Sequence, residues 1–370
     1  MKKILYITTI SDTIDSFLVP HINYLINKGY KVDCAASEQI KFSDELVKNG
    51  VEFFNIPFSR NPLDINNIKA FIKLIKIQRD NKYDIVHVHT PIASVYGRLL
   101  KLKFPNLKTI YTAHGFHFYK GAPKKNWIIY YPIEKIMSKL TDTIITMNEE
   151  DYEQALKFNI KNTYKINGVG IDLSHYNPKL YNKNEVRKEL GLRDNDFVIV
   201  MIAEVNKNKN HIQMIKAVEI LKKKGIEVKV ICAGKGPLLE YIKEEIKKRD
   251  LEENVFMLGF RNDIPKLITA CDIGMLLSYR EGLPRNIMEL MAYGKPVIGT
   301  NIRGVRDLIE DNINGNLVEI NDYEETSKKI ETLYKDKELV KRLSIDTYNK
   351  IEKYDIKYVK KSIVNIIVDK

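Results

Sequence analysis

Short runs of β-branched and apolar residues alternate with amphipathic stretches from the first residues of the chain onward. KILYITT at residues 3–9 and YKVDCAA at residues 30–36 are typical of buried strands. The segment between them, from about Asp15 to Lys28, has helical periodicity and is followed by Gly29, a common helix stop. Strand, helix and strand in this order predict a parallel βαβ unit.

The same alternation continues along almost the whole chain. In the first half, further strands are predicted at VEFFNI, DIVHVH, KTIYTA, DTIITM and TYKING, with helices near 64–79, 92–103 and 125–140. A second series begins at DFVIVMIAE and continues through EVKVICAG, NVFMLGF, DIGMLLS, KPVIGT and GNLVEI, with helices near 209–224, 237–248 and 284–292. Two such series predict an α/β protein with two Rossmann-like, doubly wound parallel-sheet domains.

A charged segment without a buried run, residues 177–195, separates the two series. We therefore expect an N-terminal domain at residues 1–178 and a C-terminal domain at residues 179–354. The final segment, residues 355–370, is predicted to be a helix that must pack against another part of the chain, because its apolar residues form one stripe. The stripe consists of Ile356, Val359, Ile363 and Ile367.

Length and composition indicate a globular protein. With 370 residues, 44% of them apolar, the chain can bury a sizeable core. No run approaches the roughly 18 apolar residues of a membrane-spanning helix, and the start, MKKILYITTISD, lacks the apolar core of a signal peptide. We therefore expect a cytoplasmic protein whose three widely separated cysteines are reduced.

The positive charge is distributed unequally between the two halves. Residues 1–180 contain 25 Lys and Arg against 17 Asp and Glu, whereas the remainder contains 35 against 31. The N-terminal half is therefore expected to face an anionic partner. Because the sequence has no zinc-finger spacing, recognition helix or aromatic-rich basic strand, nucleic acid is not expected. A phospholipid surface or a lipid diphosphate fits better.

The most informative segment is SYREGLPRNIMELMAYGKPVIGTNIRG at residues 278–304, which places Glu281 and Glu289 eight residues apart. Pro284 suits the first turn of a helix, so the backbone N–H groups of Gly282 and Leu283 lie at a positive helix terminus. Such a terminus binds phosphate. Two glutamates flanking an anion site predict a ligand with hydroxyl groups on both sides of a phosphate, as in a nucleotide sugar.

This segment resembles the retaining glycosyltransferases of family 4, whose signature is a Glu, seven residues, and a second Glu. The resemblance extends over nearly the whole chain, and TAHGFHFYKGAP with EGLPRNIMELMAYGKPVIGT is most similar to bacterial enzymes that build capsular or exopolysaccharide repeat units. It implies a GT-B fold, in which two Rossmann-like domains face each other across a cleft and the last helix returns to the first domain.

The resemblance also implies roles for individual residues in the C-terminal domain. Glu281 would hold the donor sugar, Glu289 the ribose hydroxyls, and Lys209 the diphosphate. Glu204 occupies a position where the family usually has an Arg, and an acid there would repel phosphate, so either Lys207 substitutes for the Arg or Glu204 points away from the phosphate. Further donor contacts are expected from Gly234, Arg261 and Asn286.

In the N-terminal domain, the resemblance assigns His114 to contact the donor sugar. Most relatives have a Gly-Gly loop after the first strand, but this chain has TTISDTIDSF there. Asp12 and Thr13 in this bulkier loop, together with His117, are expected to bind the acceptor. His87 and His89 are expected to be structural and to point to opposite sides of their strand, which would exclude joint metal chelation.

A cluster of cations precedes a group of aromatic residues at the start of the helix predicted near 125–140. Lys120, Lys124 and Lys125 beside Trp127 suit contact with a membrane interface. An equally acceptable interpretation is that one face of this helix is core and that the lysines are solvated.

Together these features predict a transferase that moves a hexose or N-acetylhexosamine from a UDP-sugar to a polyprenyl-diphosphate-linked sugar. No metal or other cofactor is expected, because Lys209 and the helix terminus compensate the diphosphate charge. One alternative is an enzyme similar to UDP-N-acetylglucosamine 2-epimerases, although the additional carboxylates it would need are not evident. The other is a non-catalytic scaffold for a partner transferase, which Glu204 favours and the presence of Glu281, Glu289 and Lys209 disfavours.

Overall fold

The computed structural model describes residues 1–368, which form two compact units. The first contains Met1–Gly170 and the C-terminal segment from Ile356, and the second contains Ile171–Asp355. The second unit begins at Ile171, which forms a β-bridge with Asp355, whereas the sequence pattern places the boundary after residue 178. Residues 369–370 of the helix expected at 355–370 lie outside the described residues.

The first unit is built around a parallel sheet with the strand order β3-β2-β1-β4-β5-β6-β7. Its strands are β1 (Lys3–Ile10), β2 (Lys31–Ser37), β3 (Phe53–Asn55), β4 (Ile85–His89), β5 (Lys108–Ala113), β6 (Thr143–Thr146) and β7 (Asn162–Lys165). Its helices are α1 (Ser11–Phe17), α2 (Val19–Asn27), α3 (Asp44–Lys48), α4 (Asn66–Asn81), α5 (Pro91–Leu99), η1 (Leu100–Leu102), α6 (Lys124–Met137), η2 (Ser138–Leu140), α7 (Glu149–Leu156) and α16 (Ile356–Val368).

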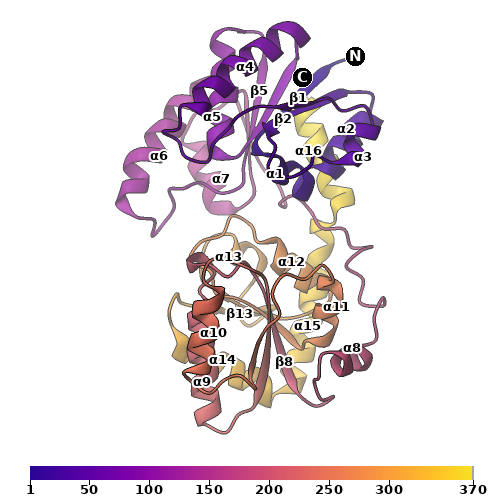
Figure 1. Cartoon of the computed structure of the whole chain (residues 1–370), viewed down its shortest axis with the longest axis vertical. Coiled ribbons are helices and arrows are strands. Elements are labelled where there is room, and N and C mark those ends of the chain that lie inside the picture. The colour runs from indigo at the N-terminus through magenta and orange to yellow at the C-terminus, as the bar shows by residue number, and fades with distance from the viewer. Residues whose placement is uncertain (369–370) are drawn as a thin grey trace. The chain divides into compact units, whose positions relative to one another are not determined.

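The C-terminal helix α16 packs on α2 within the first unit, as Figure 1 shows by its yellow ribbon beside indigo elements. Four of the buried side chains of α16 are Val359, Ile363, Val364 and Ile367. This face largely matches the apolar stripe that the sequence indicates, although Ile356 is only partly buried. Burial of an otherwise exposed apolar face explains why the chain returns to the first unit.

The helix expected from Asp15 to Lys28 is instead two helices, α1 and α2, which meet at Leu18. Pro20 lies in the first turn of α2, where its missing N–H and fixed φ favour a new helix start over continuation of α1. The sequence predicts a loop directly after β1, but among the described residues the chain is already helical from Ser11 onward.

The second unit has a parallel sheet with the order β10-β9-β8-β11-β12-β13. Its strands are β8 (Phe197–Ile202), β9 (Val228–Ala233), β10 (Val255–Met257), β11 (Ile273–Leu276), β12 (Val297–Thr300) and β13 (Gly315–Val318). Its helices are α8 (Lys183–Glu189), η3 (Lys207–Lys209), α9 (His211–Lys223), α10 (Leu239–Lys247), α11 (Ile264–Ala270), α12 (Arg285–Ala292), α13 (Val305–Leu308), α14 (Tyr323–Lys335), α15 (Lys337–Ile351) and η4 (Glu352–Tyr354).

Both sheets reverse their strand order at one point, between β1 and β4 in the first unit and between β8 and β11 in the second. Loops that follow the two strands on either side of such a point diverge and leave a crevice at the carboxyl ends, where open α/β sheets bind ligands. The predicted fold class, with two doubly wound parallel sheets, is confirmed. The three cysteines are buried thiols. Among the described residues, no helix is long and apolar enough to cross a membrane.

Candidate active site

In the second unit, the loops after β8 and β11 are joined by two hydrogen bonds, one between backbone groups and one from a side-chain amide to a backbone carbonyl. The N–H of Tyr279 donates to the carbonyl of Asn208 over 2.8 Å, and the Asn208 amide donates to the carbonyl of Arg280 over 3.1 Å. The side chain of Asn206 accepts a hydrogen bond from the N–H of Lys209 at 3.1 Å and so caps the 3-10 turn η3. These bonds fix the position of Lys209 relative to the second loop.

Lys209 and Glu281, predicted separately for the diphosphate and the sugar, form an ion pair. Lys209 Nζ lies 2.6 Å from Glu281 Oε1, and the two side chains are 19% and 12% exposed. The two charges therefore neutralise each other. Glu281 Oε2 and the other N–H groups of the Lys209 ammonium form no hydrogen bond among the described residues. The sequence argument did not foresee this pairing, because the two residues are 72 positions apart.

Glu289 projects from the middle of α12 into a buried environment. Its Oε1 accepts a hydrogen bond from the Tyr176 hydroxyl at 2.7 Å and lies 3.3 Å from Arg285 Nε. Burial raises the pKa of Glu289, and the hydrogen bond from Tyr176 and the charges of Arg285 and His175 oppose that rise. Both contacts use Oε1, and Oε2 has no hydrogen bond among the described residues.

The turn before α12 is held by backbone approach as well as by side chains. Gly304, with φ of +76°, lies so close that a Cβ added to it would be 2.2 Å from the Gly282 carbonyl oxygen and 3.3 Å from the Leu283 nitrogen. The buried Arg303 donates from Nε to the Glu281 carbonyl at 3.2 Å. Only glycine fits at position 304 without moving this turn.

Arg303 and Tyr176 are site residues that the sequence reasoning missed. Arg303 is part of TNIRG, directly after β12, where a cation near the carboxyl ends of the strands is a recognisable signal. Tyr176 lies over 100 positions before Glu289 and follows a segment without regular structure, so nothing in its local sequence indicates the contact.

Other predicted donor residues make structural contacts. The amide of Asn286 donates to the Ile202 carbonyl at 2.6 Å, and Arg261 forms a two-bond ion pair with Asp263 at 2.8 and 2.6 Å. Gly234 packs against the Ala203 carbonyl, only 1.9 Å from where a Cβ would be. The side chains of Glu204 and Lys207 are exposed. Donor binding by Asn286, Arg261, Gly234 and Lys207 stays a prediction.

In the first unit, His114 follows β5 directly and contacts a second histidine. Its Nε2 lies 2.9 Å from Nδ1 of His89, the last residue of β4. The rings of His87 and His89 are 4.3 Å apart, so the expectation that they point to opposite sides of the strand is wrong. Residues two apart on a strand share a face, which the period of two requires.

These histidines belong to a buried group that we call the histidine cluster: His21, His87, His89 and His114 with Tyr6. Burial lowers the pKa of His21 and His114 to about 4 and that of His87 to about 3, and it also lowers the pKa of His89. Polar atoms without a hydrogen-bond partner among the described residues line a cavity of about 10 Å³, a volume near that of one water probe. They are Tyr6 Oη, His21 Nδ1, His87 Nδ1 and His89 Nε2.

The reversal point of the first sheet also carries a strained residue. Thr90 has φ of +62°, which is unusual for a β-branched residue. Its hydroxyl accepts from the N–H of Thr9 at 3.0 Å and donates to the His89 carbonyl at 2.5 Å. Asp12 and Thr13 are half-buried in the first turn of α1, a few residues after Thr9. A strained position held by such bonds marks a candidate functional location.

The remaining predicted residues lie along α6 and before it. His117 stacks on Tyr130 with ring centroids 4.5 Å apart. Trp127, which suits either a membrane interface or the core face of the helix, is partly buried: it packs against Phe118 and donates from Nε1 to the Tyr119 carbonyl at 3.2 Å. The apolar side chains that α6 exposes are isoleucines, with the largest exposures being 73% for Ile128 and 64% for Ile136.

Comparison with known proteins identifies the family. The model of group 1 glycosyl transferases matches residues 182–350, and a glycosyl transferase 4-like model matches residues 3–148. A putative glycosyltransferase of Bacillus subtilis, EpsD, is 38% identical over 92% of this chain and 90% of its own length. This chain belongs to the group 1 glycosyltransferases. The predicted family, and with it the expectation of a glycosyltransferase enzyme, is confirmed.

Two further proteins extend the comparison. An Escherichia coli enzyme named UDP-Gal:alpha-D-GlcNAc-diphosphoundecaprenol alpha-1,3-galactosyltransferase is 29% identical over 80% of this chain and 78% of its own. The crystal structure of Anabaena HepE with UDP and glucose superposes with a TM-score of 0.82 at 19% identity and covers 99% of both chains. This likeness confirms the GT-B fold.

Among residues 1–368, no three His, Cys, Asp or Glu side chains are grouped to hold a metal ion.

Proposed function

We propose that this glycosyltransferase moves a hexose or N-acetylhexosamine, with retention of anomeric configuration, from a UDP-sugar to a sugar on a polyprenyl diphosphate. The product would be an intermediate of a capsular or exopolysaccharide repeat unit. The observation that carries the proposal is the Lys209–Glu281 ion pair at the reversal point of the second sheet. The Escherichia coli relative, whose name gives a UDP-sugar donor and a diphosphoundecaprenol acceptor, supports the substrate classes.

The ion pair suggests how donor binding is organised. A diphosphate that reaches Lys209 competes with Glu281 for the ammonium group, because phosphate carries more charge than one carboxylate. Glu281 then turns its oxygens to hydroxyl groups of the sugar. The backbone N–H groups at Gly282 and Leu283, at the amino end of α12, add positive potential for the departing diphosphate, and Lys207 adds a further cation.

The second glutamate would bind the nucleoside. Glu289 Oε1 is held by Tyr176 and Arg285, which leaves Oε2 to accept hydrogen bonds from the ribose hydroxyls. In the first unit, we propose that His114 contacts the sugar and that Asp12, Thr13 and His117 contact the acceptor. His114 Nδ1 has no hydrogen bond among the described residues, since its bond to His89 uses Nε2.

Calorimetric titration with UDP-, GDP- and ADP-sugars, with EDTA present, tests the donor site. We expect binding of UDP-sugars that Glu289→Gln weakens at least about tenfold, a loss of roughly 1.4 kcal/mol. Transfer to a synthetic polyprenyl-diphosphate sugar should continue in EDTA, because protein groups alone compensate the diphosphate charge. Absence of nucleotide binding in the folded protein would favour the scaffold. Turnover of UDP-N-acetylglucosamine without acceptor would favour the epimerase-like enzyme.

We further propose that α6 rests on the anionic cytoplasmic face of a membrane, where a lipid-linked acceptor is found. Its exposed isoleucines, Ile128, Ile129, Ile133 and Ile136, lie beside exposed lysines, which include Lys120, Lys124 and Lys125. Apolar side chains flanked by cations fit the interface of anionic lipids. Trp127 is replaced in this role by the isoleucines, since its indole packs inward.

Sedimentation with vesicles tests this surface. Anionic phosphatidylglycerol vesicles should carry the protein down, neutral phosphatidylcholine vesicles should not, and Ile129→Ser with Ile133→Ser should reduce the bound fraction. Substitution of Ile313 by Ser, at a 46% exposed position in the second unit, is the matched control and should leave the bound fraction unchanged. Equal binding to both kinds of vesicle, or none to either, would contradict the proposal.

A further inference from the structure

A second charged pocket lies in the second unit, at the opposite end of the sheet from Lys209 and Glu281. Its volume is about 440 Å³. Asp272 directly precedes β11 and Lys295 precedes β12, so both lie at the amino ends of parallel strands. Ligand sites of open α/β sheets lie at the carboxyl ends, which makes this pocket separate from the nucleotide site.

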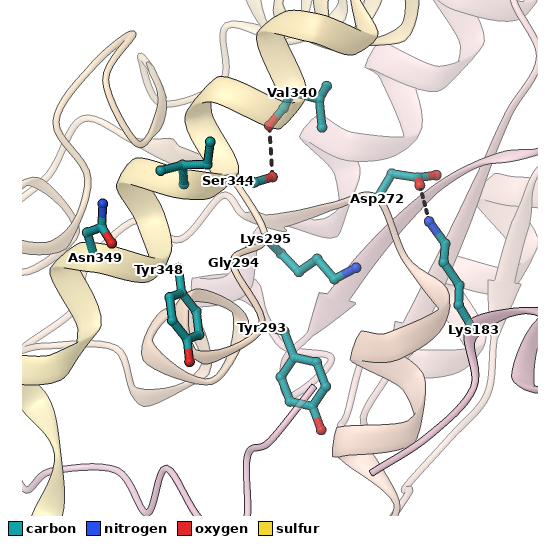
Figure 2. Close-up of a pocket in the computed structure, with 10 residues that line it drawn as sticks. Lys183, Asp272, Tyr293, Gly294, Lys295, Val340, Ser344, Tyr348 and Asn349 are labelled. Carbon is teal, nitrogen blue, oxygen red and sulfur yellow. Dashed lines mark hydrogen bonds and ion pairs between the residues drawn. The ribbon is translucent and has the colours of Figure 1, made fainter. Parts of the chain in front are cut away.

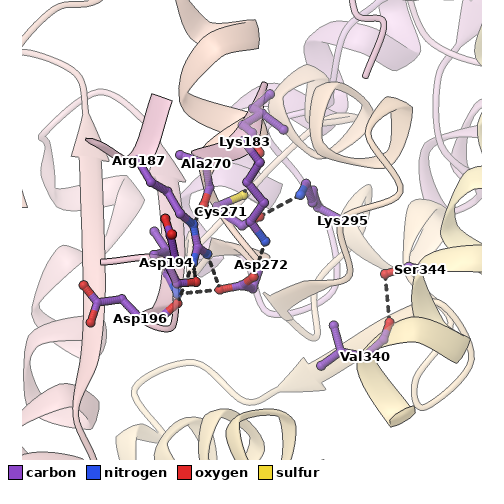
Figure 3. A network of polar contacts seen from close by, with 12 residues as sticks. Lys183, Arg187, Asp194, Asp196, Ala270, Cys271, Asp272, Lys295, Val340 and Ser344 are labelled. Carbon is purple, nitrogen blue, oxygen red and sulfur yellow. Dashed lines mark hydrogen bonds and ion pairs between the residues drawn. The ribbon is translucent and has the colours of Figure 1, made fainter. Parts of the chain in front are cut away.

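One wall of the pocket carries more positive than negative charge (Figure 2). Asp272 accepts from Lys183 Nζ at 2.6 Å and from Arg187 Nη2 at 2.9 Å. Figure 3 shows both cations converging on this carboxylate, with Lys295 close by. Of these cations, Lys183 and Lys295 line the pocket together with Asp272, whereas Arg187 is buried outside the lining, so the lining carries one positive charge more than Asp272 compensates.

Lys295 is the cation whose charge is least compensated. Its Nζ donates to the Cys271 carbonyl at 2.6 Å, and among residues 1–368 it forms no ion pair. Burial lowers its pKa, which shows that the surroundings disfavour the bare ammonium charge. An anion in the pocket would compensate the charge and accept from its remaining N–H groups.

The facing wall is aromatic and apolar. Tyr348 and Ile345 project from α15 and are 54% and 63% exposed, whereas Tyr293, which follows α12, is only 7% exposed and forms the base of this wall. Figure 2 shows the rings of Tyr293 and Tyr348 on the same side of the Lys295 side chain. Such rings offer apolar area and flat faces to a ligand at low cost in conformational entropy.

We propose that this pocket binds a small phosphate monoester whose phosphate lies at Lys295 and Lys183 and whose ring or apolar group lies against Tyr348 and Ile345. The volume is within the range of about 300–1,000 Å³ for small-molecule sites. A phosphate monoester carries a charge of about −1.5 to −2 at neutral pH and three acceptor oxygens, so it can compensate Lys295 and also accept a hydrogen bond from Lys183. The proposal does not depend on the identity of the donor or acceptor.

Isothermal titration with phenyl phosphate tests the pocket. We expect saturable binding near 1 mM or tighter, weaker binding of inorganic phosphate and benzoate, and none of phenol. Lys295→Gln keeps a hydrogen-bond donor and removes the charge. It should weaken the binding of phenyl phosphate at least about tenfold. The matched control is Lys341→Gln, an exposed lysine on α15 outside the pocket, which should bind as the wild type does.

Two further measurements separate the pocket from the nucleotide site. Saturating UDP should leave the affinity for phenyl phosphate unchanged, and displacement by UDP would overturn the proposal. Tyr348→Ala, at a 54% exposed position, should also weaken the binding of phenyl phosphate and should affect the binding of inorganic phosphate little. The proposal fails if the wild type shows no saturable heat, or if Lys295→Gln, folded by circular dichroism, binds equally well.

Discussion

The two units place polar groups at the same topological position but in opposite electrostatic states. At the reversal point of the second sheet, Lys209 and Glu281 are charged, paired and partly accessible. At the reversal point of the first, the histidine cluster is buried, and burial lowers the pKa of each of its four histidines. In each unit the reversal point of the parallel sheet thus provides the position of a ligand site. The side chains at that position decide whether the site suits an anion or neutral hydroxyl groups.

This difference fits a division of labour between the two units in the proposed reaction. A diphosphate needs fixed positive charge, which Lys209 and the amino end of α12 supply. A neutral histidine offers one donor and one acceptor, which suits sugar hydroxyls. His89 Nδ1 and His114 Nε2 share one hydrogen, so the tautomer of each ring determines the other.

The largest effect is expected from breaking the ion pair. Lys209→Met and Glu281→Gln should each lower transfer about 100-fold or more, because each removes a group that contacts charge or sugar in the transition state. The double variant should lose less than the product of the two, since the residues are coupled. Radiolabelled sugar transfer measures all three. Lys223→Met, which breaks an exposed pair with Glu219, is the control and should keep full activity.

The next effect concerns acid stability. The histidines of the cluster have folded-state pKa values below the unfolded value of about 6.5, so the unfolded chain binds more protons as pH falls from about 6.5 toward 4. The stability present above pH 6.5 is therefore lost in this window, at about 1.4 kcal/mol per pH unit for each such histidine.

Urea unfolding at pH 7.5 and 5.5 measures this loss. Trp127 is the single tryptophan and packs in the first unit, so its fluorescence reports that unit. In the second unit, His211 is the one histidine among the described residues whose pKa is lowered, to about 4. Hydrogen exchange should accordingly show a smaller acid loss there. An equal loss of stability in the two units on acidification would contradict the comparison. His87→Gln should make the stability of the first unit depend less steeply on pH.

A smaller effect is expected from the turn before α12. Gly304→Ala places a methyl group against the Gly282 carbonyl, and the resulting shift should weaken UDP-sugar binding by roughly 10- to 100-fold, or about 1–3 kcal/mol of strain. Gly225→Ala is the matched control, since it has a similar φ of +72° and no atom within 4 Å of the added Cβ. If the two variants bind UDP-sugar equally well, the close approach of Gly304 to the backbone of Gly282 does not determine the shape of the turn before α12.

The smallest effect is expected from Tyr176→Phe, which removes the hydrogen bond to Glu289 Oε1. Loss of one such bond corresponds to roughly 0.5–1.5 kcal/mol, so UDP affinity should fall about two- to tenfold. The hydroxyl also lowers the pKa of Glu289, and its removal should raise that pKa further. UDP binding should then decline at a higher pH during acidification, as titration calorimetry at several pH values would show.

Periodicity and short motifs were sufficient for much of the fold. The strands and most helices were predictable because apolar runs and amphipathic stretches alternate regularly. The break between α1 and α2 was missed, although Pro20 signals it locally. The orientation of His87 and His89 was predicted wrongly despite a local rule, since strand residues two apart share a face. Both errors were avoidable from the sequence.

Other features were beyond the sequence. Trp127 and Ile128 are neighbours with similar apolar character, and only the packed helix shows that the indole turns inward while the isoleucine remains exposed. Tyr176 meets Glu289 across 113 positions of chain, a distance over which no local pattern acts.

The amino-acid sequence by itself determined two doubly wound sheets and the family of the enzyme, because these depend on local propensity and on motifs contiguous in the chain. Only the tertiary structure decided that Lys209 and Glu281 are paired, that four histidines share one buried cluster, and that a cationic pocket lies at the amino ends of β11 and β12. The physical reason is that ion pairing, desolvation and cavities arise from packing between segments distant in sequence, and each depends on where the strands bring their ends together.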